Sequence, residues 1–213
     1  MSGGTRVAID VGGTFTDVVT LSGDSAALKF DKVPTTPSHP EEGVLNGFAA
    51  GGAPMADIAT FIHGTTLGLN ALLTRRGART GIVTTKGFRD VYLLGRTDRI
   101  PMYDFKYRKP ASLVERQHIV EVDERLDFEG RVLTPFDEES AIAAARTIRD
   151  LGLDAVAVSF LHSYVNPAHE VRMAEILKAE APDVVVTISS DLSRQLREYE
   201  RTSTAVLDAY IKP

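Results

Sequence analysis

The alternation of apolar and polar residues at the start of the chain predicts three β-strands. β-Branched and apolar residues dominate the runs 5–11, 14–21 and 26–33, and short turns containing glycine or aspartate separate them. Turns this short join neighbouring antiparallel strands, so we expect a meander. A proline-punctuated segment follows, and the spacing of Val44, Leu45 and Phe48 then predicts a helix over residues 41–50.

After this helix, strand-like and helix-like segments alternate along the chain. Strands are expected at 60–63, 80–84, 154–160 and 184–188. Helices are expected at 66–75, 88–94, 134–151 and 166–177, with a last helix through 192–210. In the third of these, Thr134 is the expected N-cap and Pro135 lies in the first turn. This order predicts the α/β class, with a mixed β-sheet flanked by helices. Residues 95–134 interrupt the alternation and are interpreted as an inserted subdomain, which gives four expected parts: 1–94, 95–134, 135–190 and 191–213.

Composition narrows the class of protein. Of 213 residues, 43% are hydrophobic and 25% are charged, which is typical of a soluble globular protein with a sizeable core. The net charge of −5 argues against binding to nucleic acid or an anionic membrane surface. The chain has no cysteine, which excludes disulfides, thiolate nucleophiles and cysteine-ligated metals. Because neither a signal peptide nor a long apolar segment is recognisable, we expect a cytoplasmic protein with no membrane association.

The first candidate site is the turn between the first two expected strands. Gly12 and Gly13 remove side chains where the backbone bends, so main-chain N–H groups and the Thr14 hydroxyl can approach an anion closely. Asp10 and Asp17 flank the turn and can hold a hydrated divalent cation, with Asp10 orienting a metal-bound water. A plain tight turn with two solvated aspartates is the alternative. The spacing of all five residues favours a nucleotide-phosphate hairpin, for which ATP and Mg²⁺ are the expected ligands.

The second candidate site follows the strand expected at 60–63, where the chain enters a helix. Ligands of open α/β sheets bind at this edge, and the free N–H groups of a first helical turn favour an anion or a polarised carbonyl. Thr65 is expected to cap the helix. We take His63 and Thr65 as candidate catalytic residues, and Thr66 and Asn70 as candidate substrate-binding residues. The alternative is simple capping beside a structural histidine.

The third candidate contains His162, His169 and Glu170, which suggest a metal site. The seven-residue spacing of His162 and His169 is not that of a zinc site, and a catalytic zinc site would need a third ligand besides the two histidines. The preferred interpretation is therefore structural: Asn166 caps a helix, Pro167 begins it, and His162 lies at a strand end beside the ligand edge.

A run of charged residues at 194–204 is the last candidate. It is interpreted as a solvated helix face in which Arg197 and Arg201 are balanced by glutamates. The alternative is a helix whose Ser203 and Thr204 line an interface with a further lobe. Exposed arginines elsewhere, above all Arg96, could bind an acidic substrate or phosphate, although a solvated surface is the simpler interpretation.

Several segments together resemble the hydantoinase A/5-oxoprolinase family of the actin-like ATPase superfamily. The resemblance is carried by the hairpin 7–17, by His63-Gly64-Thr65-Thr66 with Asn70-Ala71-Leu72-Leu73, and by further blocks in the expected order: 77–80, 84–90, 95–96, 161–170 and 197–204. It covers nearly the whole chain. It implies an actin-like, ribonuclease H-like ATPase lobe belonging to an ATP-dependent enzyme that opens cyclic amides. Relatives carboxylate ketones, and both chemistries are expected to activate a carbonyl or enolate oxygen by phosphorylation.

The chain departs from the family pattern in length. No second Asp-x-Gly-Gly hairpin follows Asp17, although the superfamily binds nucleotide between two lobes. We therefore expect a piece of a longer chain that folds but is inactive alone, with residues 191–213 leading into the second lobe. The resemblance also implies a HyuB-like partner subunit, a homo- or hetero-oligomer, and a small cyclic amide or ketone as substrate. A ketone carboxylase subunit and a non-catalytic nucleotide-binding module remain the alternatives.

Overall fold

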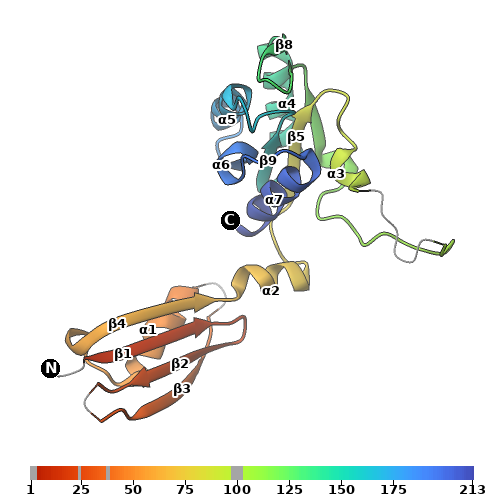
Figure 1. The fold of residues 1–213 in the computed structure, drawn as a ribbon. Helices are drawn as coiled ribbons and strands as arrows, with labels where there is room; N and C mark the ends of the chain where they lie inside the picture. The colour runs from red at the N-terminus through yellow and green to blue at the C-terminus, as the bar shows by residue number, and fades with distance from the viewer. Residues whose placement is uncertain (1–3, 24, 37–38, 97–102) are drawn as a thin grey trace. The chain divides into compact units, whose positions relative to one another are not determined.

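The computed structural model describes residues 4–23, 25–36, 39–96 and 103–213, and the chain forms two compact units, residues 1–76 and 77–213. The first unit contains β1 (Thr5–Val11), β2 (Phe15–Leu21), β3 (Leu28–Pro34), α1 (Pro40–Gly51), a 3₁₀ turn (Met55–Asp57), β4 (Ile58–Thr65) and α2 (Leu67–Thr74). Its sheet has the order β3-β2-β1-β4 (Figure 1). The expected antiparallel meander is confirmed, and β4 adds to it parallel to β1.

Helix α1 packs closely against one face of this sheet. A Cβ atom added to Gly43 or Gly47 would lie 2.8 Å from side-chain atoms of Thr16 and Val18, respectively, so a larger residue would push the helix away. Partly buried Val44 and Phe48 pack with the buried strand residues, as predicted. Leu45 does not, because it is 59% exposed and lies outside the glycine-lined contact.

The two edges of the first sheet differ in chemistry. The edge strand β3 carries two lysines, an aspartate and a terminal proline, which discourage pairing with another chain. The other edge strand, β4, has no Lys, Arg, Asp, Glu or Pro, and its Phe61 and Ile62 are 45% and 60% exposed. The β4 edge is therefore the less protected of the two.

The second unit is built on a parallel sheet of order β10-β9-β5-β6. Its strands are β5 (Thr80–Thr85), β6 (Ile119–Val122), β9 (Ala155–Ser159) and β10 (Val185–Ile188), with a separate small ladder of β7 (Arg125–Leu126) and β8 (Val132–Thr134). Its helices are α3 (Val91–Leu94), a 3₁₀ turn (Arg116–His118), α4 (Glu138–Asp150), α5 (Ala168–Glu180), α6 (Ser189–Leu192) and α7 (Glu198–Ile211).

Two apolar cores sandwich the second sheet. One contains residues of α4 and α5, and the other contains residues of α3 and α7, so every residue of β5 and β9 is buried (Figure 1). Strands covered on both faces are typical of parallel sheets. The predicted α/β class is thus confirmed, although its strands form two four-stranded sheets and the small β7–β8 ladder rather than one sheet. Among the described residues, no helix is long and apolar enough to cross a membrane.

Two expectations about chain organisation differ from the structure. The boundary between compact units falls after Arg76, not at 94/95, and β6, within the expected insertion 95–134, is a strand of the second sheet. The last helix begins at Glu198 rather than at 192, because Arg197 has a φ of 95° that a right-handed helix cannot include.

Candidate functional site

The first two predicted sites meet at one end of the first sheet. Strands β1 and β4 are parallel, and Val11 and Thr65 are register partners at their carboxyl ends. The glycine turn that follows β1 and the helix that follows β4 therefore leave the sheet at the same edge. This edge is where open α/β sheets bind ligands.

Hydrogen bonds fix the start of α2 to the end of β1. The Thr65 hydroxyl donates to the Val11 carbonyl oxygen at 3.2 Å and accepts from the Leu67 N–H at 3.2 Å. The N–H of Thr66 also donates to Val11, at 3.1 Å. Thr65 therefore supplies the capping hydroxyl, as expected, although Thr66 occupies the N-cap position.

The glycine turn lies directly against α2. A Cβ atom added to Gly13 would lie 3.0 Å from Asn70 Nδ2, which is closer than a side-chain contact normally allows. Asn70 is itself oriented by a hydrogen bond to the Thr66 hydroxyl at 3.4 Å. Gly12 closes the turn by donating to the Phe15 carbonyl at 2.9 Å. Position 13 therefore requires glycine because the backbone there lies close to Asn70. The sequence alone did not predict this contact.

This arrangement leaves several backbone donors available. Within the described part of the chain, the N–H groups of Gly13 and Thr14 in the turn, and of Gly68 and Leu69 in the first turn of α2, have no hydrogen-bond partner. Unpartnered amides in a tight turn and at a helix N-terminus both favour anions. We call these four residues the anion cradle. It is the feature of the first unit best suited to phosphate groups.

The two aspartates of the hairpin have different surroundings. Asp10 and Asp17 are cross-strand partners on β1 and β2. Asp17 is in an ion pair with Lys32 at 3.0 Å, which competes with its expected role toward a cation. Asp10 is exposed beside Gly64, whose missing side chain gives the Asp10 carboxylate room. Mg²⁺ in phosphate sites retains several waters and needs one or two carboxylates, so Asp10 fits an ion held through water.

His63 does not share a face of the sheet with Asp10. It pairs with Ile9, while Asp10 pairs with Gly64, and neighbouring residues of a strand point to opposite faces. The His63 ring stacks on Phe61 with centroids 6.2 Å apart. Because Phe61 contacts Phe48 of α1, His63 lies on the helix-covered side. The first unit therefore does not bring the expected catalytic pair Asp10 and His63 together.

Arg96 belongs to the second unit, so the structure does not place it with Thr66 and Asn70. Its guanidinium forms an ion pair with Glu200, in the first turn of α7. The expected role of Arg96 in substrate binding therefore stays a prediction, and it concerns a different part of the molecule.

Sequence reasoning missed a charged network inside the second unit. Arg201 is only 1% exposed and Glu170 is fully buried, so the interpretation of 194–204 as a solvated face is wrong for Arg201. Arg201 donates to the Phe160 carbonyl at 2.7 Å, to the Ser189 hydroxyl at 3.1 Å and to the Gln195 carbonyl at 3.2 Å. Burial lowers the pKa of Arg201, and the nearby Glu170 carboxylate opposes this effect.

Glu170 completes this network from helix α5. It accepts hydrogen bonds from the Phe160 N–H at 2.9 Å, the Ser189 hydroxyl at 2.6 Å and the Ser190 N–H at 2.9 Å. The segment after β9, helix α6 and helix α7 are thereby held together. The small residues that follow Arg201, which allow close packing on β9, are the signal in the sequence that points to burial.

The expected structural interpretation of the histidine block agrees with the observed contacts. His169 Nδ1 lies 2.7 Å from a carboxylate oxygen of buried Glu124, whose other oxygen accepts from Thr85. The Asn166 side chain accepts from the Ala168 N–H at 3.1 Å just before α5, although Pro167 rather than Asn166 occupies the N-cap position. Helix α5 begins at Ala168, one residue after Pro167.

Comparison with known proteins identifies the family. The fold defines a two-unit α/β protein with an anion cradle at a strand–turn–strand hairpin. Residues 6–181 match the model of the hydantoinase/oxoprolinase N-terminal region, and the chain belongs to this family.

Its relatives include both carboxylases and amide hydrolases. The chain is 41% identical over 230 residues to the acetophenone carboxylase gamma subunit of Aromatoleum aromaticum, covering 97% of this chain and 31% of that protein. It is 36% identical over 218 residues to the caprolactamase subunit alpha of Pseudomonas jessenii, covering 98% and 31%. A nucleotide-free acetone carboxylase structure superimposes with a TM-score of 0.88 at 27% identity, covering 100% and 32%. The chain thus spans about a third of the relatives' length.

Proposed function

We propose that this chain is the N-terminal part of an ATP-dependent cyclic-amide hydrolase, and that its anion cradle binds the nucleotide phosphates. The proposal rests on one observation: in the described part of the chain, four amides without a partner, those of Gly13, Thr14, Gly68 and Leu69, lie in the segments that follow the neighbouring carboxyl ends of β1 and β4. Relatives described as ATP-dependent support the choice of nucleotide.

The proposed chemistry activates a carbonyl that water attacks slowly. The γ-phosphoryl group passes from ATP to the amide oxygen, and ADP leaves. Water then adds to the carbon and the C–N bond breaks as the amine takes up a proton, which leaves an acyl phosphate. A second water hydrolyses this acyl phosphate to the carboxylate and free phosphate. Positioning and charge stabilisation carry such a transfer, so no protein nucleophile is required. The cradle amides would hold phosphate oxygens, and Asp10 would orient water bound to Mg²⁺, which neutralises phosphate charge when present.

A ketone carboxylase is the second candidate, favoured by the 41% identity to the acetophenone carboxylase gamma subunit. The same phosphoryl transfer to a carbonyl or enolate oxygen would serve it, with a carbon nucleophile in place of water. The cradle therefore fits both the hydrolase and the carboxylase. The two enzymes differ in the substrate that they use besides ATP, which is a cyclic amide for the hydrolase and a ketone with bicarbonate for the carboxylase.

The test uses the full-length protein with its partner subunit, because the chain spans about a third of its relatives. ATP hydrolysis is measured with cyclic amides and, separately, with ketones plus bicarbonate. Stimulation by cyclic amides, with release of the ring-opened product, supports the hydrolase. Stimulation only by ketone plus bicarbonate identifies a carboxylase, and nucleotide binding without stimulation by either indicates a non-catalytic module.

A further inference from the structure

The parallel sheet of the second unit contains a topological switch point. From β5 the chain moves to one side to form β6, and then returns to the other side to form β9 and β10. Ligands of open parallel sheets bind outside the carboxyl ends of the strands at such a point. Here the two strand ends are Thr85 of β5 and Ser159 of β9, and neither belongs to the anion cradle.

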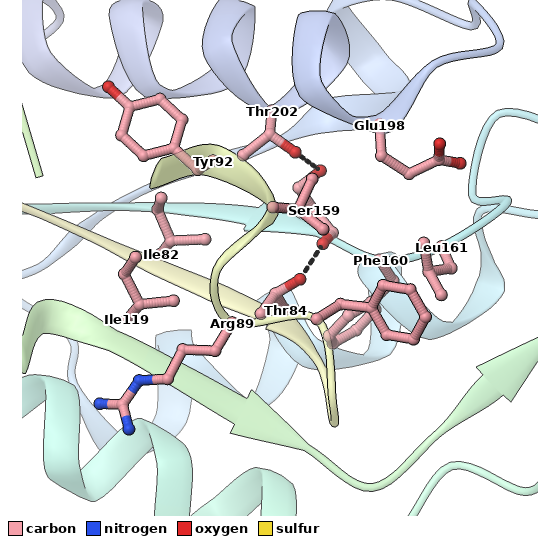
Figure 2. Close-up of a pocket in the computed structure, with 12 residues that line it drawn as sticks. Ile82, Thr84, Arg89, Tyr92, Ile119, Ser159, Phe160, Leu161, Glu198 and Thr202 are labelled. Carbon is pink, nitrogen blue, oxygen red and sulfur yellow. Dashed lines mark hydrogen bonds between the residues drawn. The ribbon is translucent and has the colours of Figure 1, made fainter. Parts of the chain in front are cut away.

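A hollow lies at this position. A cavity of about 10 Å³ is lined by Thr84, Ser159 and Thr202, which are linked by hydrogen bonds of 3.0 and 2.7 Å (Figure 2). It adjoins an open groove of about 400 Å³, a volume suited to a small molecule. We call this the switch-point groove, and its principal walls are Phe88, Val91, Leu161, Arg197, Glu198 and Tyr199.

Within the described residues, two opposite charges in the groove make no direct contact with a partner, although Arg197 interacts electrostatically with Glu200, and Glu198 with Arg201. Arg96 and Glu200 pair with each other, but within the described residues the side chains of Arg197 and Glu198 form no hydrogen bond or ion pair. Figure 2 shows the Glu198 carboxylate pointing away from Ser159 and Thr202. The groove thus offers guanidinium donors and a carboxylate acceptor beside an apolar wall.

The backbone at Arg197 is held in place by the buried network. Its φ of 95° lies in a region that residues with side chains rarely adopt. Buried Arg201 maintains the bend by donating its backbone N–H to the Arg197 carbonyl and its side chain to the Gln195 carbonyl, both at 3.2 Å. Strained conformations that the surrounding structure enforces cluster at ligand sites.

We propose that the switch-point groove binds the carbonyl substrate, a small cyclic amide. The amide oxygen accepts from the Arg197 guanidinium, the ring N–H donates to the Glu198 carboxylate, and the methylenes lie against Phe88, Val91 and Leu161. A ketone would leave Glu198 without a donor. The choice of substrate rests on the proposed function, whereas the location rests on the groove itself.

The test is an amide NMR titration of the 213-residue chain with 2-pyrrolidinone, without ATP. We expect saturable shifts in the groove residues, and about tenfold weaker binding in each of R197Q and E198Q, because each loses a hydrogen bond to a charged group. R194Q is the matched control, since Arg194 is exposed and does not line the groove. N-Methyl-2-pyrrolidinone, which lacks the N–H donor, should bind about tenfold more weakly.

Several results would overturn the assignment. These are no shift in the groove, unchanged binding in R197Q and E198Q, equal binding of the N-methyl compound, or tighter binding of the open-chain zwitterion 4-aminobutanoate. Because the titration contains no nucleotide, it stands apart from the ATPase assay. Lactam binding in the groove without lactam-stimulated ATP hydrolysis would refute the hydrolase and leave the groove as a lactam site.

Discussion

Replacing Arg201 by methionine should strongly destabilise the second unit. The substitution keeps an unbranched side chain but removes three hydrogen bonds, to Phe160, Ser189 and Gln195. It also leaves buried Glu170 without its nearby cation. At about 1–1.5 kcal/mol for each bond, the loss is about 3–4.5 kcal/mol. This agrees with the range of about 3–5 kcal/mol for breaking a buried charge pair.

Urea denaturation followed by tyrosine fluorescence measures this loss selectively. All six tyrosines lie in residues 77–213 and the chain has no tryptophan, so the signal reports the second unit alone. R172M is the matched control, because Arg172 makes ion pairs with Glu138 and Glu175 at the exposed surface. The free energy of unfolding should fall in R172M by well under half of its fall in R201M. Equal losses in the two variants would refute the argument that the buried network stabilises this unit.

Three further outcomes are expected. Gly13→Ala should weaken ATP binding about tenfold, because its Cβ meets Asn70 and moves the Gly13 and Thr14 amides away from the first turn of α2. The temperature of thermal unfolding should barely change, and an unchanged ATP affinity by calorimetry would contradict this prediction. The hydrogen bond from Arg172 lowers the pKa of Glu138 below its ordinary value of 4.5. The ionised Glu138 therefore stabilises the folded state fully above pH 4.5, and this contribution is lost as the pH falls through the pKa of the folded state. The wild type should therefore lose stability relative to Glu138→Gln between pH 5 and 3, and parallel curves would refute this. Ile62→Lys should reduce self-association in sedimentation by protecting the β4 edge, and an unchanged profile would argue against exposure of that edge.

The sequence predicted the elements with strong local signals. The meander, β5 and β9 follow from apolar runs and short turns. The hydrogen bonds that Thr65 and Asn166 accept from the first amides of their helices follow from local sequence. These features depend on neighbours within a few residues. The division of the strands into two sheets was not predictable in this way, because it depends on which strands pair across long stretches of chain.

The candidate site was predictable in part for the same reason. The spacing around Gly12 and Gly13 indicated an anion-binding turn, but the contact between Gly13 and Asn70 joins segments 57 positions apart. Asp10 and His63 face opposite sides of the sheet. Predicting this requires the register in which β1 pairs with β4, which the sequence alone does not give. The burial of Arg201 was missed because a charged helical run is usually solvated. The small residues after it hint at close packing, but its partners Phe160, Ser189 and Gln195 are far away in the sequence or outside the helix.

The central claim is that the hairpin turn and the first turn of α2 together hold nucleotide phosphates. The most direct measurement is an amide NMR titration of the 213-residue chain with Mg²⁺-ATP, compared with Mg²⁺ and adenosine alone. The account predicts saturable shifts at Gly13, Thr14, Gly68 and Leu69 with the nucleotide and none with adenosine. Unmoved cradle amides at millimolar ATP, or shifts confined to residues 77–213, would contradict it.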